Sequence, residues 1–231
     1  MTRAAAATTR PASTPTPAST PIPYQLMERI RHGIITGHYP PGSALREQTM
    51  EREYGSSRGP VREALRLLQL AGLVTHEPRR GFRVREYSPI LIEQTYRLRA
   101  LLERHGVESL TGRPLGPLAK TLRATNARMA ELFAAHDIAG YLEANGHFHR
   151  AILDAAENEP LQRSLATLNE TAQPIRYALL ARQFDRSQAI ADHDMIIQLL
   201  EAGDVEVAAV AMERHVLRHM TAASQVFATT L

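Results

Sequence analysis

The sequence predicts a mainly α-helical chain of 231 residues in two parts. Apolar residues recur at helical spacing through most of the chain from Tyr24 onward. A strand pattern occurs in one short segment, residues 73–84, where two apolar runs flank the turn Arg79-Arg80-Gly81. Beyond residue 89 only helical patterns follow, separated by glycine and proline breakers. We therefore expect a small domain of helices and a hairpin, followed by an all-α antiparallel bundle.

Composition excludes several classes of protein. The chain has no cysteine, which excludes a disulfide scaffold, a cysteine nucleophile and a thiolate metal site. No apolar run approaches the roughly 18 residues that a membrane helix needs, so an integral membrane protein is not expected. Residues 1–23 consist mostly of Ala, Thr, Ser and Pro and predict a disordered tail. Polar residues interrupt this tail too early for a secretory signal, so the expected location is the cytoplasm.

Three helices are expected in residues 24–54 and after Ser57. The first carries Leu26, Ile30 and Ile34 on one stripe and ends at Gly37. A second, at about residues 46–54, is stopped by Gly55, and Ser57 offers an N-cap for the third. The third helix ends at Gly72, and the hairpin of residues 73–84 follows it. Three helices and a hairpin make a winged helix-turn-helix, which we place at residues 24–86.

Basic residues concentrate in this segment. Residues 24–86 carry eleven arginines and seven glutamates, whereas the rest of the chain beyond residue 86 is net acidic. Arg58, Arg62 and Arg66 are spaced four apart, so they share a face of the third helix. In a helix-turn-helix the start of this helix reaches base edges in the major groove. Arg79, Arg80 and Arg83 of the hairpin would lie against the DNA backbone or minor groove. The alternative is a solvated face whose arginines pair with Glu47 or Glu63.

The residues of this segment resemble one family of regulators. Carrying the resemblance are Pro41-Gly42, Leu45-Arg46-Glu47, the run from Gly55 to Leu65, Ala71-Gly72-Leu73-Val74 and Arg80-Gly81-Phe82-Arg83-Val84. They look like the N-terminal domain of GntR-family bacterial transcription regulators. The resemblance implies a homodimer on a palindromic operator. It also implies that DNA is contacted by Arg46, Gln48, Arg58, Arg62, Arg66, Arg80 and Gly81.

The C-terminal part is expected to be a helical bundle. After a linker at residues 87–89, we place an effector-binding and dimerisation domain at 90–231. Its expected helices are 90–111, 115–136, 138–156, 160–182, 187–202 and 205–227. Short motifs here, among them Phe148-His149-Arg150, Asp192-His193 and Glu213-Arg214-His215, resemble the FadR-like subfamily with an FCD domain. Six helices favour its VanR-like branch.

Histidines in the bundle suggest a metal site. Asn145 and His149 are four apart on one expected helix, and His193 and His215 lie on two later helices. Three imidazoles and one oxygen donor suit Zn, Ni, Fe or Mn. The resemblance implies that these four residues are the ligands. Because Asn145 supplies a neutral amide oxygen where a carboxylate would supply charge, we expect a lower affinity or an altered metal preference. The alternative is that each histidine is an ordinary hydrogen-bonded residue, which is how we interpret His147 and His219.

The expected ligand is a small organic acid. Arg99 and Arg176 are candidates to bind its carboxylate, with a surface salt bridge as the alternative for each. The predicted function is a DNA-binding transcription regulator, a repressor controlled by a carboxylate effector at or near a divalent metal (Zn, Ni or Mn), and not an enzyme. Two alternatives are a metal-dependent hydrolase, and a constitutive DNA-binding dimer without an effector.

Overall fold

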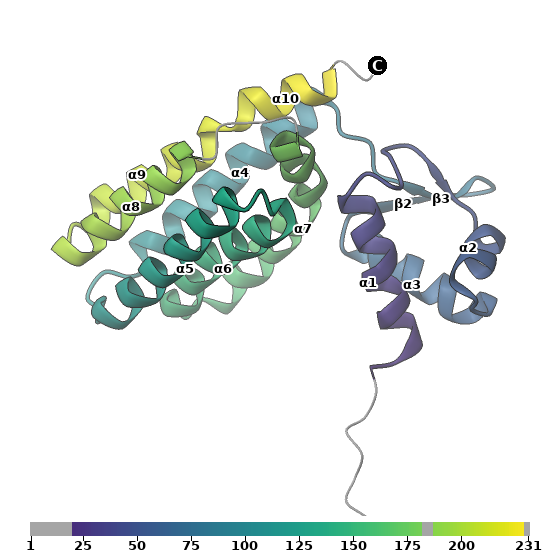
Figure 1. Ribbon diagram of the computed structural model, residues 1–231, viewed down its shortest axis with the longest axis horizontal. Coiled ribbons are helices and arrows are strands. Elements are labelled where there is room, and N and C mark those ends of the chain that lie inside the picture. Colours follow the sequence, from purple (N-terminus) through teal and green to yellow (C-terminus); the bar gives the residue numbers. More distant parts are fainter. Residues whose placement is uncertain (1–19, 182–186, 229–231) are drawn as a thin grey trace, which may run out of the picture.

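The computed structural model describes residues 20–181 and 187–228. The first nineteen residues of the predicted disordered tail lie outside this part. The described chain forms two lobes, a smaller N-terminal lobe with a sheet and a larger helical bundle (Figure 1). This is the mainly α architecture that the sequence predicts. Among the described residues, no helix has both the length and the hydropathy needed to cross a bilayer.

The N-terminal lobe is a winged helix-turn-helix with a three-stranded sheet. Its elements are α1 (Ile22–Ile35), β1 (Ala44–Leu45), α2 (Glu47–Tyr54), α3 (Arg58–Leu70), β2 (Val74–Glu77) and β3 (Gly81–Val84). The antiparallel strands are ordered β1-β3-β2. β1 was not predicted, because a strand of two residues is too short to show a periodic pattern. It pairs Ala44 with Arg83 and Leu45 with Phe82 at the edge of the expected hairpin.

The core of this lobe confirms the predicted apolar stripes. Ile30 from α1 and Val61, Leu65 and Leu68 from α3 are fully buried. α1 begins at Ile22, two residues earlier than expected, because proline in the first turn of a helix loses no intrahelical hydrogen bond. The packed stripes hold α3 by one side and leave its other side to solvent.

The bundle contains α4 (Pro89–Glu108), α5 (Gly116–Ala134), α6 (Ile138–Ala156), α7 (Glu159–Ala181), α8 (Ser187–Ala202), α9 (Val205–Arg218) and α10 (Met220–Ala228). The predicted bundle of about six helices is thus present. The helix expected at 205–227 is interrupted at His219, which separates α9 from α10. The core lies between α4, α6, α8 and α9, around the fully buried Ile92, Phe148 and Ile196.

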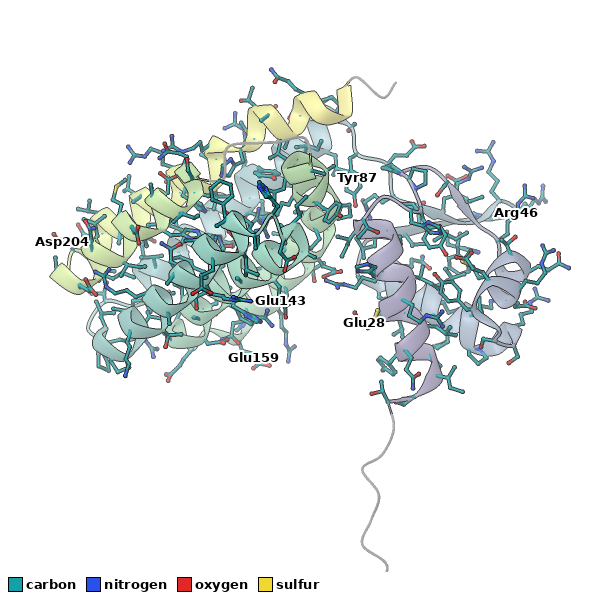
Figure 2. The ribbon with its side chains drawn as sticks, viewed as in Figure 1. Glu28, Arg46, Tyr87, Glu143, Glu159 and Asp204 are labelled. Atoms are coloured by element: carbon teal, nitrogen blue, oxygen red, sulfur yellow. The ribbon has the colours of Figure 1, made fainter. Side chains whose placement is uncertain are left out.

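The two lobes touch through α1 and α7 (Figure 1). Arg31 of α1 donates two hydrogen bonds to Glu170 of α7, one of them with a nitrogen–oxygen distance of 2.8 Å. Gly72, which follows α3, lies against Thr171 of α7. Tyr87 is buried at the junction between the lobes (Figure 2). α7 therefore joins the bundle to the winged domain in this arrangement.

Candidate DNA-binding face and candidate metal centre

α3 presents the predicted arginines on its solvent side. Arg58, Arg62 and Arg66 are exposed, whereas Val61 and Leu65 are buried on the opposite side. Gly55 ends α2 in the left-handed conformation at φ 61°, which glycine adopts without a steric penalty and which turns the chain into α3. The N-cap Ser57 makes no side-chain capping bond. The first turn of α3 therefore keeps backbone N–H groups that can meet a phosphate.

Glu47 is the partner of two of these arginines. Arg58 Nε lies 2.7 Å from one Glu47 oxygen, and Arg62 Nε lies 3.6 Å from the other. The ion pairing proposed as the alternative is therefore present for Arg62 through Glu47. The Arg58 and Arg62 side chains are nevertheless 71% and 47% exposed. Exposed ion pairs contribute about 0–1 kcal/mol, so a phosphate or a base can compete with Glu47 for either guanidinium.

The remaining predicted DNA-binding residues lie on α2, α3 and the wing. Arg46 and Gln48 at the start of α2 are exposed, and Arg46 lies on the side of the winged domain away from the bundle (Figure 2). Arg80 is exposed near Glu77, and Gly81 adopts a positive φ of 77° at the tip of the hairpin. Arg83 differs from its expectation, because it donates a 2.6 Å hydrogen bond to the carbonyl of Gly42 within the domain.

The three predicted histidine ligands meet inside the bundle. His149 of α6, His193 of α8 and His215 of α9 are all buried, and one ring nitrogen from each lies within 4.8 Å of the others. His193 Nε2 is 3.1 Å from His215 Nε2. The His193 ring stacks on Phe148, with a centroid separation of 3.8 Å and an interplanar angle of 4°. Stacking fixes the His193 ring, so its Nε2 points at the other two histidines.

Two carboxylates that the sequence analysis did not assign orient the other two rings. His149 Nδ1 lies 3.2 Å from Glu103 of α4, and His215 Nδ1 lies 3.3 Å from Asp192 of α8. Because each carboxylate is ionised, each Nδ1 carries the ring proton and donates a hydrogen bond to a carboxylate oxygen. The Nε2 atom of each ring then keeps a free lone pair. Carboxylate partners of this kind are typical of metal-binding histidines. Asp192 precedes a predicted ligand, whereas nothing in the local sequence pattern of α4 identifies Glu103.

Burial and charge decide the protonation of the cluster. Burial lowers the pKa of His193 well below its ordinary value, and the neighbouring His215 and His149 lower it further. Burial alone would raise the pKa of Glu103, but His149 and Arg99 outweigh it and bring this pKa to about 2. The pKa of Asp192 is also about 2, because hydrogen bonds from His215 and Gln188 outweigh its desolvation. The site thus combines a neutral imidazole with two carboxylates that stay ionised.

The donor set fits a divalent metal. With both Nδ1 protons directed at carboxylates, two Nε2 lone pairs point into the centre, and His193 Nε2 must carry a proton to face His215 at 3.1 Å. A cation can take the place of that proton. The buried His193 Nδ1 has no hydrogen-bond partner among the described residues. Asn145 is buried one turn before His149 on α6 and lines the same pocket.

The pocket beside the histidines holds both predicted effector arginines. It is a cavity of about 60 Å³ whose lining includes Tyr96, Arg99, Tyr141, Asn145, His149, Arg176, His215 and His219. Arg99 is buried and already donates a 2.7 Å hydrogen bond to Asn169 of α7. Arg176 makes no hydrogen bond or ion pair within the described part of the chain. Burial and the positive charge of Arg99 lower the pKa of Arg176 to about 10, so it remains a cation at neutral pH, and no carboxylate of the described residues forms an ion pair with it.

His219, which we interpreted as an ordinary residue and not as a ligand, also lines this pocket. Its ring centroid lies 5.9 Å from that of His215, and burial lowers its pKa to about 4. The spacing of four residues from His215 was the available sequence signal. A hydrolase would need a general base beside the metal, and Glu143 and Asp194, two carboxylates near the predicted ligands in sequence, do not line the pocket. Glu143 is exposed (Figure 2), and Asp194 accepts a hydrogen bond from Asn126.

Comparisons with known proteins agree with both lobes. The model of "Bacterial regulatory proteins, gntR family" matches residues 24–84, and the model of the FCD domain matches residues 94–218. The chain is 30% identical over 199 residues to a probable D-xylose utilization operon transcriptional repressor of Paenarthrobacter nicotinovorans, covering 86% of this chain and 87% of that protein. It is 28% identical to the gluconate operon transcriptional repressor of Bacillus subtilis, covering 78% and 74% of the two chains.

Solved structures share the fold. McbR/YncC of E. coli superposes with a TM-score of 0.76 at 19% identity, covering 90% of this chain and 99% of that one. A putative GntR transcriptional regulator from Rhodococcus sp. RHA1 gives a TM-score of 0.70 at 26% identity, covering 89% and 97%. Winged domain, helical bundle and family models together lead to one conclusion: the chain belongs to the GntR family of bacterial transcription regulators, is a DNA-binding regulator rather than an enzyme, and carries an FCD domain.

Proposed function

We propose that this regulator is a homodimeric repressor whose operator binding is controlled by a small carboxylate bound at a metal in the FCD domain. The observation that carries the proposal is a pocket lined by His149, His215 and Arg176, directly beside the point where His149, His193 and His215 converge. Both relatives described above are named as operon repressors, which supports the direction of regulation. Because it acts on operator DNA, we also propose that it is cytoplasmic. We further propose that it belongs to the VanR-like branch of the FadR-like subfamily.

The metal ligands in this proposal are Asn145, His149, His193 and His215. Zn, Ni or Mn suits a set of imidazoles with one oxygen donor. When bound, the metal would supply a Lewis acid for a carboxylate oxygen. Arg176 can bind a carboxylate by charge-assisted hydrogen bonds, for which its planar guanidinium is suited. Arg99, held by Asn169 and near Glu103, adds positive charge to the same wall.

The DNA contacts in this proposal come from the exposed side of the winged domain. Arg58 and Arg62 at the start of α3 read base edges or phosphates in the major groove. Arg46 and Gln48 contact DNA from the start of α2, and Arg66 from further along α3. Arg80 and Gly81 contact it from the wing. Apart from Gly81, which has no side chain, the six residues named here all have exposed side chains, which supports this assignment.

Dimer formation has a candidate surface on α4 and α9. Leu98 and Leu101 of α4 and Val207 and Val210 of α9 are 46–59% exposed, although they are large and apolar. An ion pair links the two helices: Arg104 Nη1 of α4 lies 2.8 Å from Glu213 Oε2 of α9. Leu101 and Val210 each lie one turn from a member of that pair, so they share its face of the bundle. A contiguous exposed apolar face is typical of a protein–protein interface.

Regulation follows from reciprocal coupling. If the effector and the operator favour different placements of the two winged domains in the dimer, each ligand weakens the binding of the other. The contact of α7 with α1 supports this mechanism, because α7 carries Arg176 in the pocket and Glu170 at the winged domain.

The test begins with selection of an operator from random DNA and measurement of its affinity by fluorescence anisotropy. The protein is then loaded with Zn²⁺, Ni²⁺ or Mn²⁺ and titrated with a panel of small carboxylic acids that includes gluconate. We expect one bound metal per chain and a weaker operator affinity with one class of acid. Failure of every acid to change operator affinity, with metal bound or absent, would support the constitutive dimer instead.

A further inference from the structure

A polar cleft separates the winged domain from the bundle. It consists of two adjoining hollows of about 610 and 380 Å³, both lined by Arg31 of α1, Gly146 and Arg150 of α6 and Gln173 of α7. We call these hollows the domain cleft. The smaller hollow is also lined by His149 and Arg176, the same two residues that line the histidine pocket. A wall that includes these two side chains therefore lies between the domain cleft and the candidate metal centre.

Gly146 indicates that the space in the domain cleft is kept open. It lies inside α6, and a Cβ added there would meet no atom within 4 Å. Glycine inside a helix costs about 0.5–1 kcal/mol relative to alanine. No close backbone approach and no positive φ explains glycine at this position. Because glycine has no side chain, the space beside this position of the cleft lining stays unfilled.

The charges along this route favour an anion. Arg150 and Arg176 both line the smaller hollow, and neither makes a hydrogen bond or ion pair to another described residue. Two carboxylates also line it: Glu170 pairs with Arg31, whereas Asp154 accepts only a 3.3 Å hydrogen bond from the neutral Gln162. Three arginines thus face two carboxylates, so the smaller hollow has a formal charge of +1, whereas Asp137 and Glu143 line the larger hollow.

We propose that the smaller hollow of the domain cleft is an anion-selective vestibule, through which a small organic acid passes over Gly146 and along Arg150 and Arg176 to reach the histidine pocket. The proposal rests on the proposed function, because it takes the pocket as the site of a carboxylate. Its outer edge includes the Arg31–Glu170 ion pair between the two lobes. An acid that occupies the vestibule thus faces both domains at once and competes with Glu170 for Arg31.

The test uses the absence of cysteine from the chain. Val216 lines the histidine pocket but not the cleft and is buried, and valine and cysteine are similar in size. Metal-free, full-length Val216→Cys protein is treated separately with two methanethiosulfonate reagents, one ending in a sulfonate and one in a trimethylammonium group. In each reaction the thiolate forms a disulfide with the reagent and releases methanesulfinate. After correction for their rates with a free thiol, we expect the anionic reagent to react about tenfold faster.

A second substitution blocks the route. Gly146→Trp fills the open space beside α6, and we expect it to slow the anionic reagent by about tenfold or more because a packed indole leaves no gap of that size. Gly116→Trp is the matched control, since Gly116 also lies in a helix with nothing within 4 Å of an added Cβ and does not line the cleft. The control should react at the rate of the parent.

Each result decides the proposal. Equal rates for the two reagents, or a rate that Gly146→Trp leaves unchanged, would overturn it, as would a thiol that reacts with neither reagent. Circular dichroism and thermal melting verify that each variant folds, and Ala189→Cys, at another small buried position in the pocket, replaces Val216→Cys if that variant does not fold. The assay uses neither metal nor effector, so its failure leaves the proposed function standing, and metal binding can fail without affecting the reaction rates.

Discussion

Replacing Glu103 with glutamine tests the histidine site most directly. The carboxylate is completely buried and accepts a hydrogen bond of 3.2 Å from His149 Nδ1. Glutamine keeps the size of the side chain and removes the charge. If its amide oxygen faces His149, the imidazole keeps its tautomer but becomes a weaker base. If its amide nitrogen faces His149, the imidazole must move its proton to Nε2 and loses the lone pair that would bind metal.

The magnitude follows from the role of such partners in metal sites. Loss of a carboxylate behind a metal-binding histidine lowers metal affinity by about 10–100-fold, which is about 1.4–2.8 kcal/mol. We expect Glu103→Gln to show this loss in a competition titration against a chromophoric chelator. Glu108→Gln is the control on the same helix, because Glu108 pairs with Arg104 at the surface, where it is 40% exposed. It should bind metal like the parent.

The same variant has a second readout in acid. The pKa of Glu103 is about 2 in the folded protein, below its ordinary value of 4.5, so its ionised form stabilises the fold. That contribution, about 3 kcal/mol, is complete above pH 4.5 and is lost as the pH falls toward 2. Glu103→Gln should therefore lose less stability than the parent over this range. If the variant binds metal with an affinity within twofold of that of the parent, Glu103 does not support metal binding by His149.

Three further predictions concern DNA binding, the ligands and pH. Arg62→Ala should weaken specific operator binding by about 1–3 kcal/mol in anisotropy titrations without lowering the melting temperature, and unchanged affinity would contradict its assignment to the recognition face. His193→Ala combined with His215→Ala should abolish metal binding in equilibrium dialysis while dimers persist in sedimentation, and undiminished metal content would exclude these ligands. The metal-free parent should lose at least about 3 kcal/mol of stability in denaturant titrations between pH 6.5 and 4, because the folded protein resists protonation of His219, whose pKa is about 4, and of the buried His193 and His215. His219→Gln should make that loss smaller by about 3 kcal/mol, and an equally steep profile in this variant would assign the loss to the other two histidines.

Sequence periodicity predicted most of the fold because its causes are local. The stripe of Val61, Leu65 and Leu68 opposite Arg58 and Arg62 follows from helical geometry alone, and the structure has it. Strand β1 and the interruption at His219 were missed because a strand of two residues and a break without glycine or proline leave no periodic trace. The convergence of His149, His193 and His215 came from the family resemblance, since their helices are distant in sequence.

By itself the sequence determined the two-part architecture and the exposed arginine face of α3, and the family resemblance identified the three histidines. The first two features depend on the order of apolar and polar residues along single helices, which is written locally in the chain. Only the tertiary structure decided that Glu103 stands behind His149, that Arg176 is buried beside Arg99 and that Glu170 of α7 holds Arg31 of α1. Each of these contacts joins helices far apart in sequence, and their partners are selected by how the helices pack and not by any local pattern.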